Sequence, residues 1–175
     1  LNHFELDVTY YNAKTMNQTF NPELSVNKYS KIYIQTGAVR NQGVELSLNY
    51  KNTWKDFTWD TGLTYSMNRN KILTLADNAV NPETGEHFSI KTLNMGGLGS
   101  TRFILKEGGS MGDIYSLMDL RKDANGAVYI DENNSVHTQS IQDADKYIKL
   151  GSVLPKGNLA WRNNFMWRNF NVGFM

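Results

Sequence analysis

The strongest constraint in this sequence is that apolar and polar residues alternate one by one along several stretches. Successive side chains of a β-strand point to opposite faces of a sheet, so a period of two predicts strands with one apolar and one polar face. In the first stretch Phe4, Leu6 and Val8 alternate with Glu5 and Asp7. The same pattern recurs through residues 2–11, 43–51, 57–68, 159–167 and 170–174. The sequence therefore predicts an all-β fold.

The longest alternating run, residues 57–68, is tall enough to cross a membrane. Its apolar face is aromatic and aliphatic, with Thr61 as the exception. At about 3.3 Å per residue and a tilt of about 40°, it would span roughly 28 Å, close to the ~25 Å apolar band of an outer-membrane barrel. The mean hydropathy of −0.50 does not argue against a barrel, because barrel strands dilute each apolar residue with a polar neighbour.

The connections between these runs are alternately short and long. Residues 51–56 and 168–169 form short links, whereas residues 12–38 and 69–156 form long, polar links rich in Asn and Gly. Outer-membrane barrels have short periplasmic turns and long extracellular loops, so this asymmetry predicts an antiparallel transmembrane barrel segment of about five strands. A structureless loop as long as the second link would be unusual, and Asn125-Gly126 predicts a hairpin inside it.

A soluble β-sandwich is the alternative that alternation alone favours, because half-buried strands are common in such proteins. The aromatic residues reverse this preference, since they lie at the ends of the apolar faces, where a membrane interface would place them. These aromatic residues are Tyr10, Tyr50, Phe57, Trp59, Trp161 and Trp167. The polar faces carry Glu5, Asp7, Glu45 and Asp60, which suits a wet lumen. We take these four acids as candidate lumen-facing, substrate-contacting residues.

Nothing in the composition indicates catalysis or a cofactor. A net charge of +1 excludes the positive field of a general nucleic-acid binder, and the absence of cysteine excludes thiol chemistry and cysteine-ligated metals. The three histidines lie far apart in the sequence and predict no zinc site. Asp123, Asn125 and Asp131 supply too few oxygens for calcium, and an Asn-Gly hairpin is the better interpretation. We therefore expect no catalytic, cofactor or metal site.

Several short segments, taken in order, resemble one family. Residues 37–48 contain Asn41, Gly43, Glu45 and Leu46 in the pattern N-x-G-x-E-L, which resembles a barrel strand of the SusC/RagA-like TonB-dependent transporters. The segments that follow in the family's order are 57–65, 68–72, 107–115, 150–156, 163–165 and 168–172. Gln42 departs from the Lys usual after that Asn. Residues 123–131 lack the central Asp and second Gly of a calcium-like loop found in many relatives.

The resemblance implies a large plugged barrel in the outer membrane of a Gram-negative bacterium of the Bacteroidota. Such a transporter imports oligosaccharides or peptides with energy relayed by TonB, and a SusD-like surface lipoprotein captures the substrate. Residues 1–175 would then be one part of the barrel wall, with the plug, the TonB-contacting segment and the remaining strands elsewhere. Two alternatives stay open: a self-contained small outer-membrane pore or structural barrel, which needs about eight strands, and a soluble glycan-binding β-sandwich.

Overall fold

The computed structural model describes residues 3–20, 23–26, 29–31, 33–81 and 84–175. These residues form an all-β structure with one short 3-10 helix, η1 (Ala144–Lys146). Among them, no helix has the length and apolar character needed to span a membrane. The chain separates into two compact units. Unit 1 comprises Leu1–Lys14, Arg40–Asn70 and Pro155–Met175, and unit 2 comprises Thr15–Val39 and Lys71–Leu154.

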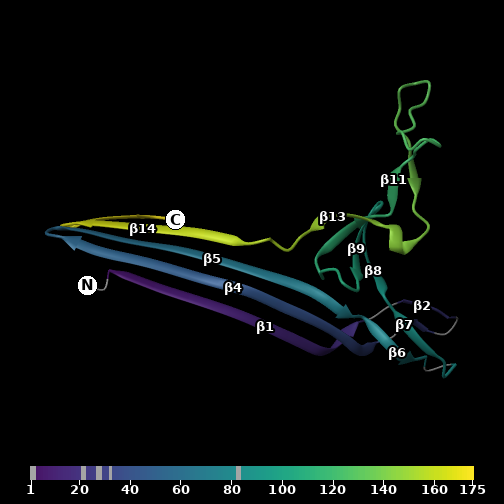
Figure 1. The fold of residues 1–175 in the computed structure, drawn as a ribbon, viewed down its shortest axis with the longest axis horizontal. Helices are drawn as coiled ribbons and strands as arrows, with labels where there is room; N and C mark the ends of the chain where they lie inside the picture. The colour runs from purple at the N-terminus through teal and green to yellow at the C-terminus, as the bar shows by residue number, and fades with distance from the viewer. Residues whose placement is uncertain (1–2, 21–22, 27–28, 32, 82–83) are drawn as a thin grey trace. The chain divides into compact units, whose positions relative to one another are not determined.

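Unit 1 is built on one open, five-stranded sheet in the order β1-β4-β5-β14-β15 (Figure 1). The strands of this sheet are β1 (Phe4–Phe20), β4 (Ile34–Trp54), β5 (Phe57–Thr74), β14 (Asn158–Trp167) and β15 (Phe170–Phe174), and residues 15–20, 34–39 and 71–74 at the ends of β1, β4 and β5 belong to unit 2. Strands β5 and β14 pair antiparallel from Ser66↔Asn158 to Phe57↔Trp167, and β14 continues through a tight turn into β15. The sheet is not closed among the described residues, which agrees with the predicted segment of a larger barrel.

The apolar face of this sheet is exposed, and within unit 1 the described residues form no second layer over it. Phe4 is 70% exposed on β1, Trp161 is 56% exposed on β14, and Phe170 is 70% exposed on β15. In a soluble sandwich these side chains would be covered by a facing sheet. A large, continuous apolar face of this kind instead marks a surface that contacts a membrane or another molecule. The prediction of strands with one apolar and one polar face is confirmed.

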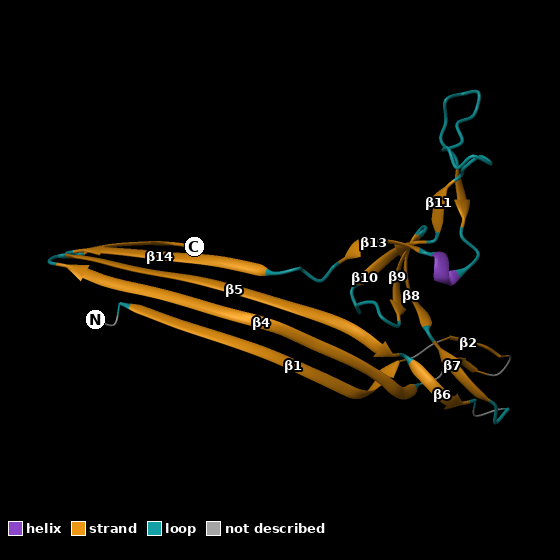
Figure 2. Ribbon diagram, viewed as in Figure 1, coloured by secondary structure: helices purple, strands orange, loops and turns teal. Residues whose placement is uncertain are grey.

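Unit 2 holds shorter strands arranged in several small sheets (Figure 2). A four-stranded sheet has the order β13-β10-β9-β8, and three two-stranded sheets pair β2 with β3, β6 with β7, and β11 with β12. The bounds are β2 (Glu23–Val26), β3 (Tyr29–Lys31), β6 (Ala76–Val80), β7 (His87–Ile90), β8 (Thr92–Leu98), β9 (Thr101–Lys106), β10 (Asp113–Ser116), β11 (Met118–Leu120), β12 (Thr138–Ser140) and β13 (Ile148–Ser152).

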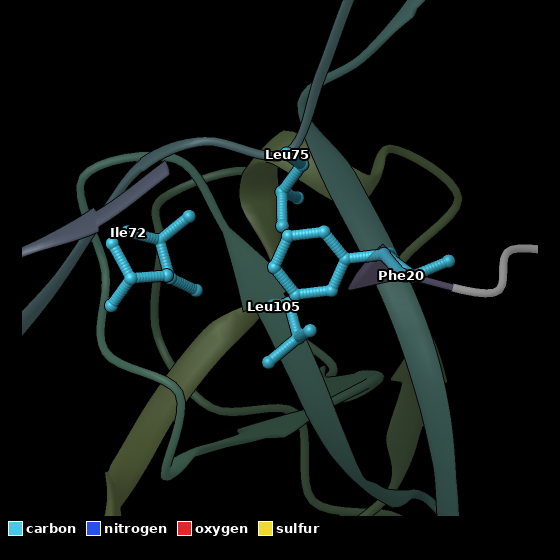
Figure 3. Packing of buried hydrophobic residues seen from close by; sticks show 6 residues of the cluster. Phe20, Ile72, Leu75 and Leu105 are labelled. Carbon is cyan, nitrogen blue, oxygen red and sulfur yellow. The ribbon is translucent and has the colours of Figure 1, made fainter. Parts of the chain in front are cut away.

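A hydrophobic core of its own stabilises unit 2 (Figure 3). Ile72 and Leu75 are almost completely buried, at 0% and 1% exposure. The core cluster consists of Phe20, Val39, Ile72, Leu75, Leu93 and Leu105, with Ile90 packed against it. Phe20 also lies against Gly37, where any Cβ would overlap its ring. The segment predicted as polar loop therefore contains a packed structure.

The strands extend further than the alternation predicted. β1 continues to Phe20, β4 begins at Ile34 and β5 ends at Thr74, so the predicted links 12–38 and 69–156 begin or end inside strands. Residues 12–19 are mostly Asn, Thr, Gln and Lys, which read as loop in the sequence. Backbone pairing in a sheet does not require apolar side chains, so a polar continuation of a strand gives no period-two signal.

A buried carboxylate joins two segments of unit 2. Asp113 at the start of β10 is 1% exposed, and its Oδ2 accepts a hydrogen bond from the Ser110 N–H at 3.0 Å. The Lys149 ammonium on β13 donates to the same oxygen at 2.6 Å. The other oxygen, Oδ1, is buried and has no hydrogen-bond partner among the described residues. Among the described residues, the Lys149 ammonium is therefore the positive charge that compensates the buried Asp113 carboxylate.

The Asn125-Gly126 hairpin predicted from the sequence is confirmed. It lies between β11 and β12, where Lys122 and Val128 form an antiparallel bridge. Gly126 adopts a φ of +84°, which favours glycine, and Asp123 Oδ1 accepts hydrogen bonds from the N–H groups of Asn125 and Ala127 at 2.8 and 3.0 Å. This carboxylate oxygen thus caps its own turn.

A second hairpin of the same design follows directly. Asp131 Oδ1 accepts hydrogen bonds from the N–H groups of Asn133 and Ser135, both at 2.9 Å, and Asn134 adopts a φ of +60°. Its other oxygen, Oδ2, lies 2.8 Å from the His137 Nε2. The hydrogen bond to His137, followed by the backbone hydrogen bond from Ser135, lowers the pKa of Asp131 below its ordinary value of 3.8.

This lowered pKa predicts an acid-sensitive hairpin. An acid whose folded pKa lies below its unfolded value stabilises the fold above pH 3.8, and that contribution is lost as the pH falls through the folded pKa. We expect the hydrogen-exchange protection factors of the Asn133 and Ser135 amides to fall as the pH is lowered from about 5 to about 2. The Asp131→Asn variant is the control, because it should abolish this dependence. Protection that stays constant in the unmodified chain would contradict the assignment.

Candidate functional site

The polar face of the unit 1 sheet contains an open concavity of about 340 Å³. Four strands line it with alternate residues: Asp7 and Thr9 from β1, Glu45 and Ser47 from β4, Thr64 and Ser66 from β5, and Asn158 and Ala160 from β14. Leu46, Tyr65 and Leu159, which lie between these residues along the strands, complete the lining. The strand order and the period of two bring these side chains together.

Two of the four predicted acids meet in this concavity. Asp7 and Glu45 are both exposed, and neither forms an ion pair or a side-chain hydrogen bond within the part of the chain that the structure describes. The concavity therefore offers two uncompensated carboxylates beside the hydroxyls of Ser47 and Thr64. Such a surface can accept hydrogen bonds from a hydroxylated solute and attract a cationic one.

The other two predicted acids lie outside the concavity. Asp60 is half-buried and accepts a hydrogen bond from the Arg162 guanidinium at 2.9 Å, so its charge is compensated. Glu5 is exposed and does not line the concavity. The sequence predicted that all four acids share one face. In the structure Asp7 and Glu45 lie together without an ion pair among the described residues, Asp60 is ion-paired, and Glu5 lies outside the concavity.

The sequence also named no candidate among the hydroxyl and amide groups of the concavity. Thr64, Ser66 and Asn158 were missed because single Ser, Thr and Asn residues carry no signal of their own. They could have been found by aligning the polar faces of β5 and β14, since Ser66 pairs with Asn158 and Thr64 with Ala160. That pairing cannot be predicted until the register of the two strands is known, and Ser66 and Asn158 are 92 positions apart in the sequence.

A glycine close to the concavity accounts for one position of the N-x-G-x-E-L pattern. Gly43 on β4 is buried, and a Cβ added there would overlap the main-chain oxygen of Met67 and the ring of Tyr11. Tyr11 therefore packs across β4 at a point where only glycine leaves room. Two residues further along β4, Glu45 reaches the concavity from the same face.

The chemistry of this face suits the binding of a polar solute. No group of three or more His, Asp or Glu side chains suited to a metal ion occurs among the described residues. His3, the histidine of unit 1, places its Nδ1 at 3.0 Å from the Lys51 carbonyl at one end of the sheet, away from the concavity lining. Carboxylates, hydroxyls and amides spread over four strands present hydrogen-bonding groups to a passing solute.

Aromatic side chains gather on the opposite face, near the short turns. The rings of Tyr50 and Trp59 meet edge to face at 5.5 Å, and Trp59 stacks on Phe165 at 6.2 Å. Phe4 contacts Tyr50 at 4.7 Å, and Trp54 stacks on Phe57 at 6.0 Å beside the β4–β5 turn. Aromatic rings concentrated near strand ends are typical of the belt that a barrel places at a membrane interface.

The chain is similar in sequence to TonB-dependent receptors of Formosa agariphila. It is 27% identical to TonB-dependent receptor P3 over 98% of its own length, and 30% identical to TonB-dependent receptor P39 over 65% of its length. It spans 18% and 9%, respectively, of these relatives. No protein-family model matches the chain.

The fold is similar to that of solved transporter structures. The structure of the RagAB peptide transporter aligns with 98% of the length of the chain, with a TM-score of 0.65 and a sequence identity of 18%. The RagAB peptide importer in its closed-closed state matches the same share with a TM-score of 0.61. The chain covers 18% of each of these structures. The chain is therefore similar in sequence to TonB-dependent receptors, and its open two-faced sheet has the fold of a segment of an antiparallel β-barrel.

Proposed function

We propose that the chain is part of an outer-membrane, TonB-dependent active importer of nutrients in a Gram-negative bacterium. The observation that carries this proposal is the two-faced sheet of unit 1, with an exposed apolar face on one side and an acid-lined polar face on the other. One face fits lipid and the other fits a water-filled lumen. Residues 1–175 would form part of the barrel wall, and the plug and remaining strands would belong to other parts of a longer protein.

The proposed substrates are oligosaccharides or peptides, and the proposed partners are a SusD-like surface lipoprotein and TonB. The fold shared with the RagAB peptide transporter supports a peptide, and the hydroxyl-rich polar face is equally suited to a sugar chain. The family resemblance of residues 37–175 supports the lipoprotein partner. TonB would act through the N-terminal region of the whole transporter. The proposed role is transport, and the names of the relatives are those of receptors and transporters.

Uptake by the whole transporter tests this proposal directly. A strain that carries the full-length gene should accumulate a labelled peptide or oligosaccharide pool, and a strain without TonB should not. The matched control is the same TonB-deficient strain with TonB restored on a plasmid. Uptake that persists without TonB would instead support a passive pore. A protein that fractionates with the soluble cell contents would support the glycan-binding sandwich.

The unpaired acids of the concavity predict a charge preference. The Asp7→Asn, Glu45→Gln double variant should raise the apparent KM for a cationic peptide by up to about thirtyfold, because each of the two exposed charge pairs contributes at most about 1 kcal/mol. Transport of a neutral oligosaccharide should change little. Glu5→Gln is the matched control, since Glu5 is exposed and outside the concavity. An equal effect of the Glu5 and double variants would show that only the overall charge of the sheet matters.

A further inference from the structure

The apolar face of unit 1 is not uniformly filled and contains a groove of about 650 Å³. Strands β1, β4, β5 and β14 contribute its lining. The lining residues are Phe4, Leu48, Tyr50, Trp54, Trp59, Thr61, Leu63 and Trp161. Its size lies in the range of small-molecule sites, and none of these side chains carries a charge. Because the groove lies wholly within one sheet, its shape is set by the pairing of that sheet.

The polar groups in the middle of the groove are already satisfied. The Trp161 indole N–H donates to Thr61 Oγ1 at 3.0 Å, and the Thr61 hydroxyl donates to the Arg162 carbonyl at 3.0 Å. The Trp59 indole N–H donates to Asn163 Oδ1 at 3.2 Å. Sugars and peptides bind through hydrogen bonds, and the indole N–H groups and the hydroxyl of these three lining residues already donate within the sheet. The Asn163 Nδ2, which has no partner among the described residues, is buried and belongs to a residue outside the groove lining. The middle of the groove therefore suits a hydrocarbon chain.

The end of the groove at the β4–β5 turn has a different character. Trp54 lies there, stacked on Phe57, and its indole N–H forms no hydrogen bond within the described part of the chain. The next residue, Lys55, forms no ion pair among the described residues, whereas Asp56 pairs with Arg168 at 3.3 Å. The turn thus carries one uncompensated positive charge and one free N–H donor beside an apolar groove. These groups complement a phosphate or ester oxygen.

We propose that this groove is a binding site for one glycerophospholipid. An acyl chain lies along Leu48, Leu63 and Trp161, and the phosphate lies at the β4–β5 turn beside Trp54 and Lys55. The inference rests on the proposed function, because it requires the apolar face to be in a bilayer. It goes beyond general lipid contact, since a shaped groove with a charged end selects one lipid molecule among its neighbours.

Native mass spectrometry of the full-length transporter in a mild detergent tests the acyl part of the site. The probes are phosphatidylglycerol and a diacylglycerol with the same chains. The unmodified protein should retain one more phosphatidylglycerol than the Leu48→Trp variant, in which the larger ring fills the groove. The Val44→Trp variant is the control, because Val44 lies on the same strand outside the groove lining. Equal retention by the Leu48→Trp and unmodified proteins would overturn the proposal.

The headgroup part of the site has its own variant, which leaves the groove intact. Lys55→Gln should weaken phosphatidylglycerol binding about fivefold and leave diacylglycerol binding unchanged, because one basic residue near a lipid phosphate contributes about 1 kcal/mol. Lys51→Gln is the control, since Lys51 belongs to the polar face of β4. Phosphatidylglycerol binding that is the same in the Lys55→Gln and unmodified proteins would also overturn the proposal.

Failure of this inference can be told apart from failure of the proposed function. The same preparations are assayed for outer-membrane fractionation and for TonB-dependent uptake. A protein that fractionates with the outer membrane and transports, but retains no specific phospholipid, disproves the lipid site alone. A protein that does neither disproves the proposed function, and the lipid site with it.

Discussion

If the unit 1 sheet lies in a membrane as proposed, Leu63→Arg should destabilise the full-length protein by about 2–4 kcal/mol in lipid, the usual cost of an Arg on the lipid face at mid-bilayer depth. Leu63 lines the apolar groove on β5 and pairs with Trp161 across the sheet. A guanidinium there has no water or acid to compensate it. Folding titrations in lipid vesicles with increasing urea measure the free energy of unfolding directly.

The adjacent residue provides the matched control. Thr64 points to the other face and lines the concavity that contains Asp7 and Glu45. An Arg at position 64 would meet water and two uncompensated carboxylates, so Thr64→Arg should cost much less than Leu63→Arg. Equal costs at the two positions would mean that both faces see the same solvent. That result would exclude a membrane wall and favour the soluble sandwich.

The two faces of the unit 1 sheet could be predicted from the sequence because they depend only on local alternation. Glu45 and Leu46 are neighbours in the chain, and a strand must send their side chains to opposite sides. No knowledge of strand pairing is needed for that step. The same reasoning predicted Asp7 on the polar face, and the structure places it with Glu45 in one concavity.

Contacts between distant segments could not be predicted, because they depend on register. The ion pair of Asp60 with Arg162 joins residues 102 positions apart. Thr61 was an unexplained polar residue on an apolar face, and its reason lies in the Trp161 indole that donates to it from the next strand. Asn163 pairs with Thr61 in the sheet and accepts the other indole hydrogen bond, from Trp59. The two polar side chains on this face therefore accept hydrogen bonds from the indole N–H groups of two tryptophans.

The core of unit 2 was missed for a different reason. Its members are spread over residues 20–105, and most of them lie in the links that the sequence predicted as polar loops. The apolar residues Ile72 and Leu75, and the run 103–105, were the available signal. They are too short to show a period, and only packing against Phe20 shows that they form one core.

This core leads to the second large expected effect. Ile72→Ala should destabilise unit 2 by about 2–5 kcal/mol, because Ile72 is 0% exposed and its truncation leaves a cavity in a packed cluster. Limited proteolysis of the full-length protein should then show cleavage within residues 71–154 at a rate tens of times higher or more, since opening of this unit becomes correspondingly more populated.

Leu98→Ala is the matched control within the same unit. Leu98 is 89% exposed, so its truncation should change stability by no more than about 0.5 kcal/mol and leave the cleavage rate nearly unchanged. If Ile72→Ala also leaves cleavage unchanged, the cluster around Phe20 is not what holds residues 71–154 together. If both variants accelerate it equally, cleavage follows general disturbance of the segment. Only a large effect confined to Ile72→Ala identifies the long link as a folded unit stabilised by its own core.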